Sequence, residues 1–83
     1  METNDQLIDK LLAAITDCTT TLANPTSKKS DLLSAHDKVL GLVSSCNVAV
    51  NGFNAEQRLK YDNLYDKATA ICHRTRRFAS ILK

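Results

Sequence analysis

Residues 53–83 read FNAEQRLKYDNLYDKATAICHRTRRFASILK and predict one uninterrupted helix. Apolar side chains recur here every three or four positions, the spacing that gathers them on one side of an α-helix. The stripe is three positions wide, which favours a helix packed against two neighbours, because a two-stranded coiled coil has a narrower seam. Its members are Tyr61, Leu64, Tyr65, Ala68, Ile71, Cys72, Thr75, Phe78, Ala79 and Leu82.

Polar residues mark the start of this helix. Asn54 is placed to accept a hydrogen bond from the first turn, and Gln57, three residues later, is placed to reach back, which predicts a capping box. Gly52 stands just upstream, where a glycine commonly ends the preceding helix. The sequence therefore predicts a tight turn at residues 51–54 and a third helix over residues 54–82.

Two further helices are predicted upstream of this turn. The first covers residues 3–23 and opens with Thr3 and Gln6 at capping-box spacing. The second covers residues 27–50, and Pro25, the only proline of the chain, separates the two.

The second helix has the weakest pattern of the three. Gly41 in its middle costs about 1 kcal/mol relative to alanine, and residues 42–50 are rich enough in β-branched side chains to resemble a strand. A lone strand in an otherwise helical chain has no partner to pair with, so we expect a helix.

Three helices joined by short connections predict an all-α fold, a small up-down-up three-helix bundle with antiparallel neighbours. The length suits a single domain over residues 1–83. The third helix is the longest, so we expect its last turn or two to extend beyond the other two helices. Phe78, Ile81 and Leu82 would then form exposed apolar surface, which commonly marks a docking site or a dimer seam.

The composition excludes several classes of protein. No stretch approaches the roughly 18–20 consecutive apolar residues of a membrane span, and the acidic start, with Glu2 and Asp5, does not fit a signal peptide. Three cysteines, an odd number without a Cys-x-x-Cys pair, do not suggest a disulfide framework. We therefore expect an intracellular protein, cytoplasmic or nuclear, that is not secreted.

Cys18 and Cys72 are expected at nearly the same height of the bundle, with His36 about one helical turn away. Two thiolates and an imidazole are typical zinc ligands, and two thiols also form redox-sensitive pairs. Zinc sites usually bring their ligands in close pairs along the chain, which these residues do not form. We therefore expect both cysteines to pack as small apolar residues, with no metal and no cofactor.

An enzyme is the poorest fit to this sequence. The chain has only two histidines, His36 and His73, and its three cysteines all lie on apolar stripes, where burial blunts a thiol. No glycine-rich phosphate loop is present, since Gly41 and Gly52 are the only glycines. A bundle this small fills its interior with its own side chains, so we expect neither a catalytic pocket nor a small-molecule substrate.

Charge is unevenly distributed along the chain. Residues 1–50 hold six acidic and four basic residues, a net charge of −2. Residues 51–83 hold three acidic and seven basic residues, a net charge of +4, and no acidic residue follows Asp66. Positive charge thus gathers at the end of the third helix.

Three interpretations of this basic end remain open. The first is a docking surface for an acidic protein, for a second copy in a homo-oligomer, or for an anionic membrane surface, and its predicted residues are Arg74, Arg77, Phe78, Ile81 and Leu82. The second is binding to nucleic-acid phosphates, through Lys67, Arg74, Arg76, Arg77 and Lys83. The third is a solvated face that complements the helix C-terminus and the acidic first half. We expect a non-enzymatic interaction module, an adaptor or small subunit of a larger assembly, with nucleic-acid binding as the alternative.

Overall fold

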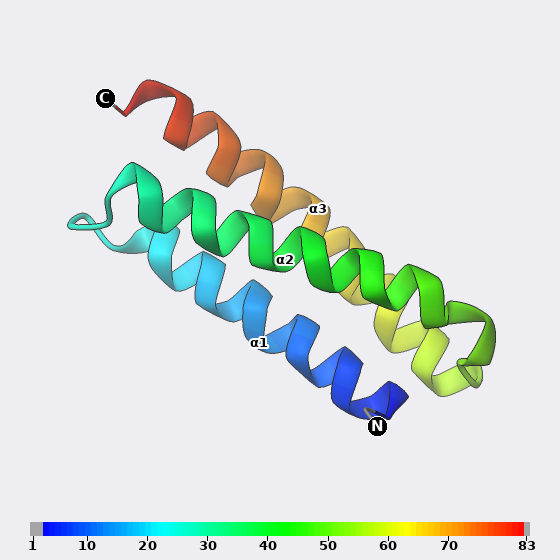
Figure 1. Ribbon diagram of the computed structural model, residues 1–83. Helices are drawn as coiled ribbons and strands as arrows, with labels where there is room; N and C mark the ends of the chain where they lie inside the picture. Colours follow the sequence, from blue (N-terminus) through cyan, green and yellow to red (C-terminus); the bar gives the residue numbers. More distant parts are fainter. Residues whose placement is uncertain (1–2, 83) are drawn as a thin grey trace.

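The computed structural model describes residues 3–82, which form a bundle of three α-helices (Figure 1). Helix α1 covers Asn4–Ala23, α2 covers Lys29–Ala49 and α3 covers Ala55–Ile81, with a short 3₁₀ turn, η1, at Val50–Gly52. Helices α1 and α3 run in the same direction and α2 runs against both (Figure 1). Within the same residues no strand occurs, and none of the helices has the length and apolar character needed to cross a membrane. The predicted all-α, up-down-up three-helix bundle is confirmed.

The C-terminal helix is the longest, as predicted, with 27 residues against 20 in α1 and 21 in α2. At about 1.5 Å per residue, α3 is about 40 Å long. Ala79 is only 2% exposed, so α3 stays packed against the bundle until its last turn. The part of α3 that extends beyond its neighbours is therefore confined to the turn that holds Ile81, the lower limit of the one or two turns expected.

Both predicted capping boxes are present. At the start of α1 the Gln6 amide donates to Oγ1 of Thr3 over 3.1 Å, and the Thr3 amide donates to Oε1 of Gln6 over 2.9 Å. At the start of α3 the Gln57 and Asn54 amides make the same exchange over 2.8 and 3.0 Å. Each box satisfies two amide groups that the first turn of a helix leaves unpaired.

Helix α2 continues through Gly41 without a break, so the residues that follow are helical, as expected, and do not form a strand.

The connection between α2 and α3 differs from the prediction. Gly52 does not adopt the left-handed conformation of a helix-ending glycine, since no described glycine has a positive φ. The prediction for Gly52 is wrong because the chain tightens into η1, where the Phe53 amide donates to the Val50 carbonyl over 3.1 Å.

Replacing Gly41 with alanine is expected to raise the free energy of unfolding by about 0.5–1 kcal/mol. Gly41 is exposed within α2, and a Cβ atom built there meets nothing within 4 Å. The gain comes from the lower conformational entropy of the unfolded chain. Urea unfolding of Gly41→Ala beside the wild type measures the difference. A destabilised variant would contradict a continuous α2 at this position.

The core contains side chains from all three helices. The predicted stripe of α3 is buried at most of its positions, but Tyr65 is 44% exposed and Phe78 is 42% exposed. These two side chains lie at opposite edges of the stripe, where the helix surface turns toward solvent. The largest fully buried side chains are Leu11, Leu32, Val39, Thr75, Cys18 and Cys46.

Candidate docking surface

Helix α3 has two partly exposed flanks, one on each side of its buried stripe. One flank borders α1, and we call it the α1 flank: its residue Lys60 lines a groove of about 310 Å³ between the N-terminal ends of α1 and α3. The other borders α2, and we call it the α2 flank: its residues Tyr65, His73 and Arg76 line a groove of about 260 Å³ beside α2, the α2–α3 groove. Residues three, four or seven positions apart lie on the same side of a helix. The spacing of any other α3 residue from these four therefore shows on which flank it lies.

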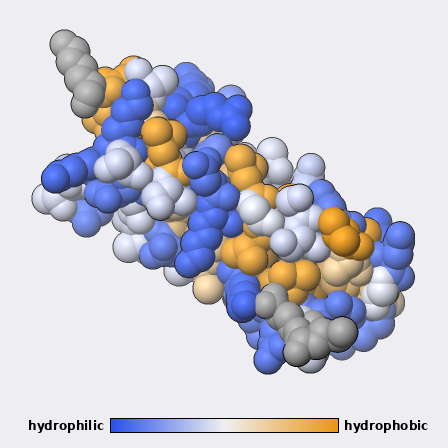
Figure 2. Space-filling model, in the orientation of Figure 1, coloured by the Kyte–Doolittle hydropathy of each residue, from blue (hydrophilic) through white to orange (hydrophobic). Residues whose placement is uncertain are grey.

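The α1 flank carries exposed basic and apolar side chains toward its C-terminal end. Lys67 and Arg74 follow Lys60 at intervals of seven residues, and Phe78 and Ile81 stand four and seven residues after Arg74. Phe78 is 42% exposed and Ile81 is 74% exposed. Apolar atoms are visible at this end of the molecule, at the upper left, with hydrophilic residues around them (Figure 2). Together with Arg77 on the adjoining outer face, these residues form what we call the C-terminal patch: Lys67, Arg74, Arg77, Phe78 and Ile81.

The basic side chains of the C-terminal patch, Lys67, Arg74 and Arg77, form no ion pair within the part of the chain that the structure describes. Of the other residues predicted for this end, Leu82 is half-buried, and its amide donates to the Ala79 carbonyl over 3.2 Å. Lys83 lies outside the described residues.

Arg76 lies on the α2 flank, apart from the patch, although the sequence grouped it with Arg74 and Arg77. Its Nη2 atom is 3.4 Å from Nε2 of His36, a side chain of α2 that is 5% exposed. Arginine can only donate, so Nε2 of His36 is the acceptor. The ring proton is then on Nδ1, which donates to Oδ1 of Asp37 over 3.1 Å. Arg76 thus fixes the tautomer of a buried histidine and links α3 to α2.

The core layer predicted for Cys18 and Cys72 has Thr75 as its polar member. Thr75 is fully buried, and its hydroxyl donates to the Ile71 carbonyl over 2.6 Å. The Cys18 thiol lies 3.4 Å from Oγ1 of Thr75 and is therefore the donor of that contact. Burial, and then the neighbouring Cys18, raise the pKa of the Cys72 thiol above its ordinary value, which keeps this thiol neutral and weakly nucleophilic.

His36 does not complete a metal site with these cysteines. Its two ring nitrogens are occupied by Arg76 and Asp37. In the part of the chain that the structure describes, no group of three or more His, Cys, Asp or Glu side chains could hold a metal ion. Cys18 and Cys72 therefore pack beside a threonine, and the histidine belongs to a separate polar contact between α2 and α3.

The α2–α3 groove was not predicted from the sequence. Its apolar wall includes Leu40 and Tyr65, which are 42% and 44% exposed, and the buried Cys72 also lines it. The available signal was the spacing of Leu33 and Leu40, which are seven residues apart and therefore lie on one side of α2. This spacing shows that the two leucines share one side of α2. It does not show which of the other helices lies beside them.

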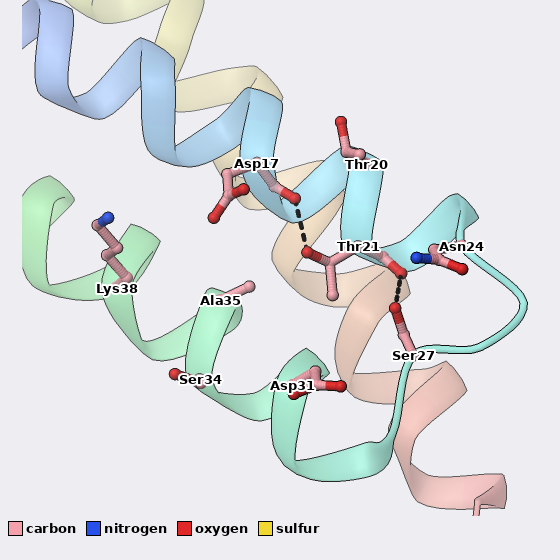
Figure 3. A pocket seen from close by; sticks show the side chains of 9 residues that line it. All are labelled: Asp17, Thr20, Thr21, Asn24, Ser27, Asp31, Ser34, Ala35 and Lys38. Atoms are coloured by element: carbon pink, nitrogen blue, oxygen red, sulfur yellow. Dashed lines mark hydrogen bonds between the residues drawn. The ribbon is translucent and has the colours of Figure 1, made fainter.

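A polar cleft of about 450 Å³ lies between the C-terminal half of α1 and the N-terminal half of α2 (Figure 3). Its two carboxylates belong to Asp17 and Asp31. Two of its hydroxyls already donate within the chain, Thr21 to the Asp17 carbonyl over 2.8 Å and Ser27 to the Thr21 carbonyl over 2.7 Å. Among the described residues that line the cleft there is no histidine, cysteine or aromatic side chain. The lining therefore supplies no imidazole base, no thiol and no aromatic surface on which a ring could stack.

The C-terminal patch combines exposed apolar side chains with basic side chains that form no ion pair among residues 3–82. Its members come from one helix, so their relative positions follow from helical geometry alone. Comparisons of the chain with protein families, with curated proteins and with solved structures found no match.

Proposed function

We propose that the protein is a non-enzymatic interaction module, an adaptor or small subunit of a larger assembly, whose C-terminal patch docks an acidic helix of a partner chain. One observation carries the proposal: the exposed Phe78 and Ile81 share an end of α3 with Arg74 and Arg77, which form no ion pair among residues 3–82. Clustered exposed apolar side chains are typical of interaction surfaces, and arginine and aromatic residues are enriched there.

The dimensions of the C-terminal patch suit a helical segment. From Lys67 to Ile81 the patch extends about 21 Å along α3, so a partner helix of about fourteen residues covers it. Apolar side chains on that helix would contact Phe78 and Ile81, and carboxylates three or four positions away would reach Arg74. Burying an apolar side chain fully contributes about 1.5–3 kcal/mol, and less where the side chain is already half-buried. The basic residues add specificity and speed to association more than affinity.

Nucleic-acid binding is the second candidate, and the charges of the C-terminal patch support it. Lys67, Arg74 and Arg77 are free of ion pairs in residues 3–82 and could contact phosphates. Arg76 adds little, because its guanidinium contacts His36 on the other flank. Phosphate contacts also leave Phe78 and Ile81 without a role. The protein partner is therefore the better supported of the two.

Selection of peptides from a random helical library displayed on phage tests the proposal. We expect the selected sequences to be rich in aspartate and glutamate, with apolar residues three or four positions apart. The double variant Arg74→Glu/Arg77→Glu is expected to bind them about tenfold or more weakly, a change of about 1.4 kcal/mol or more in binding free energy. Fluorescence anisotropy with a labelled peptide measures this loss.

A matched control distinguishes an effect of the C-terminal patch on peptide binding from an effect of the protein's net charge. The variant Lys29→Glu/Lys38→Glu changes the charge by the same amount on α2, and we expect it to bind the selected peptides like the wild type. Equal weakening in both double variants would contradict docking at the C-terminal patch, as would selected peptides without acidic residues. Displacement of the peptides by a single-stranded oligonucleotide, with an affinity that falls steeply as salt rises, would favour nucleic acid instead.

A further inference from the structure

The α1 flank of α3 is acidic at the end opposite the C-terminal patch. Asp5 and Asp9 of α1 line the groove there together with Glu56 and Lys60 of α3, a set of three acidic residues and one basic residue with a net charge of −2. Lys60 pairs with Glu56 over 3.6 Å, and Oδ1 of Asp5 accepts from Nε2 of Gln57 over 3.0 Å. We call Asp5, Asp9 and Glu56 the acidic end.

The acidic end and the C-terminal patch belong to one continuous face of the bundle. Helices α1 and α3 are parallel (Figure 1), and their register is fixed by the contact of Asp5 with Gln57 and that of Cys18 with Thr75. Along α3, Glu56 and Arg77 are about 30 Å apart. The face therefore carries negative charge at one end and the two arginines Arg74 and Arg77 at the other, with Lys67 near the middle.

An exposed leucine lies in the middle of this face. Leu12 is 47% exposed, and it stands four residues after Ile8 and three after Asp9, both of which line the acidic groove. That spacing places Leu12 on the side of α1 that borders α3. By the register of the two helices, Leu12 lies level with about residue 67, near the midpoint between the two charged ends.

We propose that the partner of the C-terminal patch is a second copy of this chain, docked antiparallel on the same face. This inference rests on the proposed function and names its partner. A two-fold axis near Leu12 places Arg74 and Arg77 of each copy over the acidic end of the other, so the same charge contact forms twice. Phe78 and Ile81 of one copy then cover the groove that Asp5 and Asp9 line, and Leu12 contacts its counterpart across the axis.

The antiparallel arrangement is the one that the charges select. A parallel arrangement of the same faces sets basic end against basic end and acidic end against acidic end, and like charges in contact oppose association. The charged ends are exposed, so added salt screens their attraction. We therefore expect a dimer that weakens as the ionic strength rises.

Sedimentation velocity of the full chain over a range of concentrations tests this arrangement. In low salt we expect the sedimenting mass to rise with protein concentration, from that of the 9.2 kDa monomer toward twice that value. Asp9→Lys/Glu56→Lys makes both ends basic, and Arg74→Glu/Arg77→Glu makes both ends acidic, so each variant alone is expected to associate about tenfold or more weakly. Mixed together, the two variants are complementary at both ends and are expected to form a mixed dimer.

Several outcomes would overturn the dimer. They are a wild type that stays monomeric at millimolar concentration in low salt, charge variants that dimerise like the wild type, or two variants that do not associate when mixed. Circular dichroism confirms that each variant is folded, and Lys29→Glu/Lys38→Glu should dimerise normally. If the chain is monomeric but still binds the selected acidic peptides through Arg74 and Arg77, the inference fails while the proposed function stands.

Discussion

Leu11→Ala is expected to lower the free energy of unfolding by about 2–5 kcal/mol. Leu11 is fully buried and belongs to the cluster that joins α1 to α2 and α3. Shortening it loses the transfer free energy of the removed atoms and leaves a cavity that a close-packed core fills only in part. Domains of this size have a total stability of about 4–12 kcal/mol, so we expect a large loss of folded protein near body temperature.

The adjacent residue provides the control for this loss. Leu12 is 47% exposed, so Leu12→Ala removes less buried surface, and we expect a cost below about 1 kcal/mol. Thermal and urea unfolding followed by circular dichroism measure both variants under the same conditions. A smaller loss for Leu11→Ala than for Leu12→Ala would mean that α1 is rotated relative to the arrangement described here.

Arg76→Ala is expected to cost about 1–3 kcal/mol, whereas Arg77→Ala should change the free energy of unfolding by less than about 0.5 kcal/mol. Removing Arg76 leaves Nε2 of the buried His36 without its donor, and an unsatisfied buried acceptor carries its full desolvation cost. Arg77 forms no ion pair among residues 3–82. The two substitutions remove the same charge from neighbouring positions, so their difference isolates the contact with His36.

Urea unfolding measures the stability of both arginine variants, and ¹⁵N NMR of the histidine ring adds an independent readout. In the wild type we expect the His36 proton on Nδ1 while the ring is neutral, and a weaker preference for that tautomer in Arg76→Ala. Equal stability of the two variants, with the same His36 tautomer in both, would contradict a stabilising contact between Arg76 of α3 and His36 of α2.

Helix number, order and caps could be predicted because each depends on residues close together in the chain. The Asn54–Gln57 capping box needs only two side chains three positions apart, and it forms as expected. The stripe of α3 depends on a period of 3.6 residues, and that period places Leu64 and Ile71 in the core.

The flanks of α3 could not be predicted in the same way. Arg76 and Arg77 are neighbours in the sequence, but a step of about 100° around the helix turns them in different directions. Only the three-dimensional arrangement shows that Arg76 meets His36, which lies forty residues away in the chain. The ending of α2 was missed for another reason. A glycine also suits a 3₁₀ turn with negative φ, so Gly52 alone does not determine which ending forms.

The most direct test of the C-terminal patch is a map of backbone amide shifts by ¹⁵N–¹H NMR while a selected acidic peptide is titrated into the protein. Docking at the patch predicts the largest changes at Lys67, Arg74, Phe78 and Ile81, with little change at Tyr65 and His73 on the α2 flank. The largest changes around Leu40, Tyr65 and His73 would place the binding surface in the α2–α3 groove and contradict docking through the C-terminal patch.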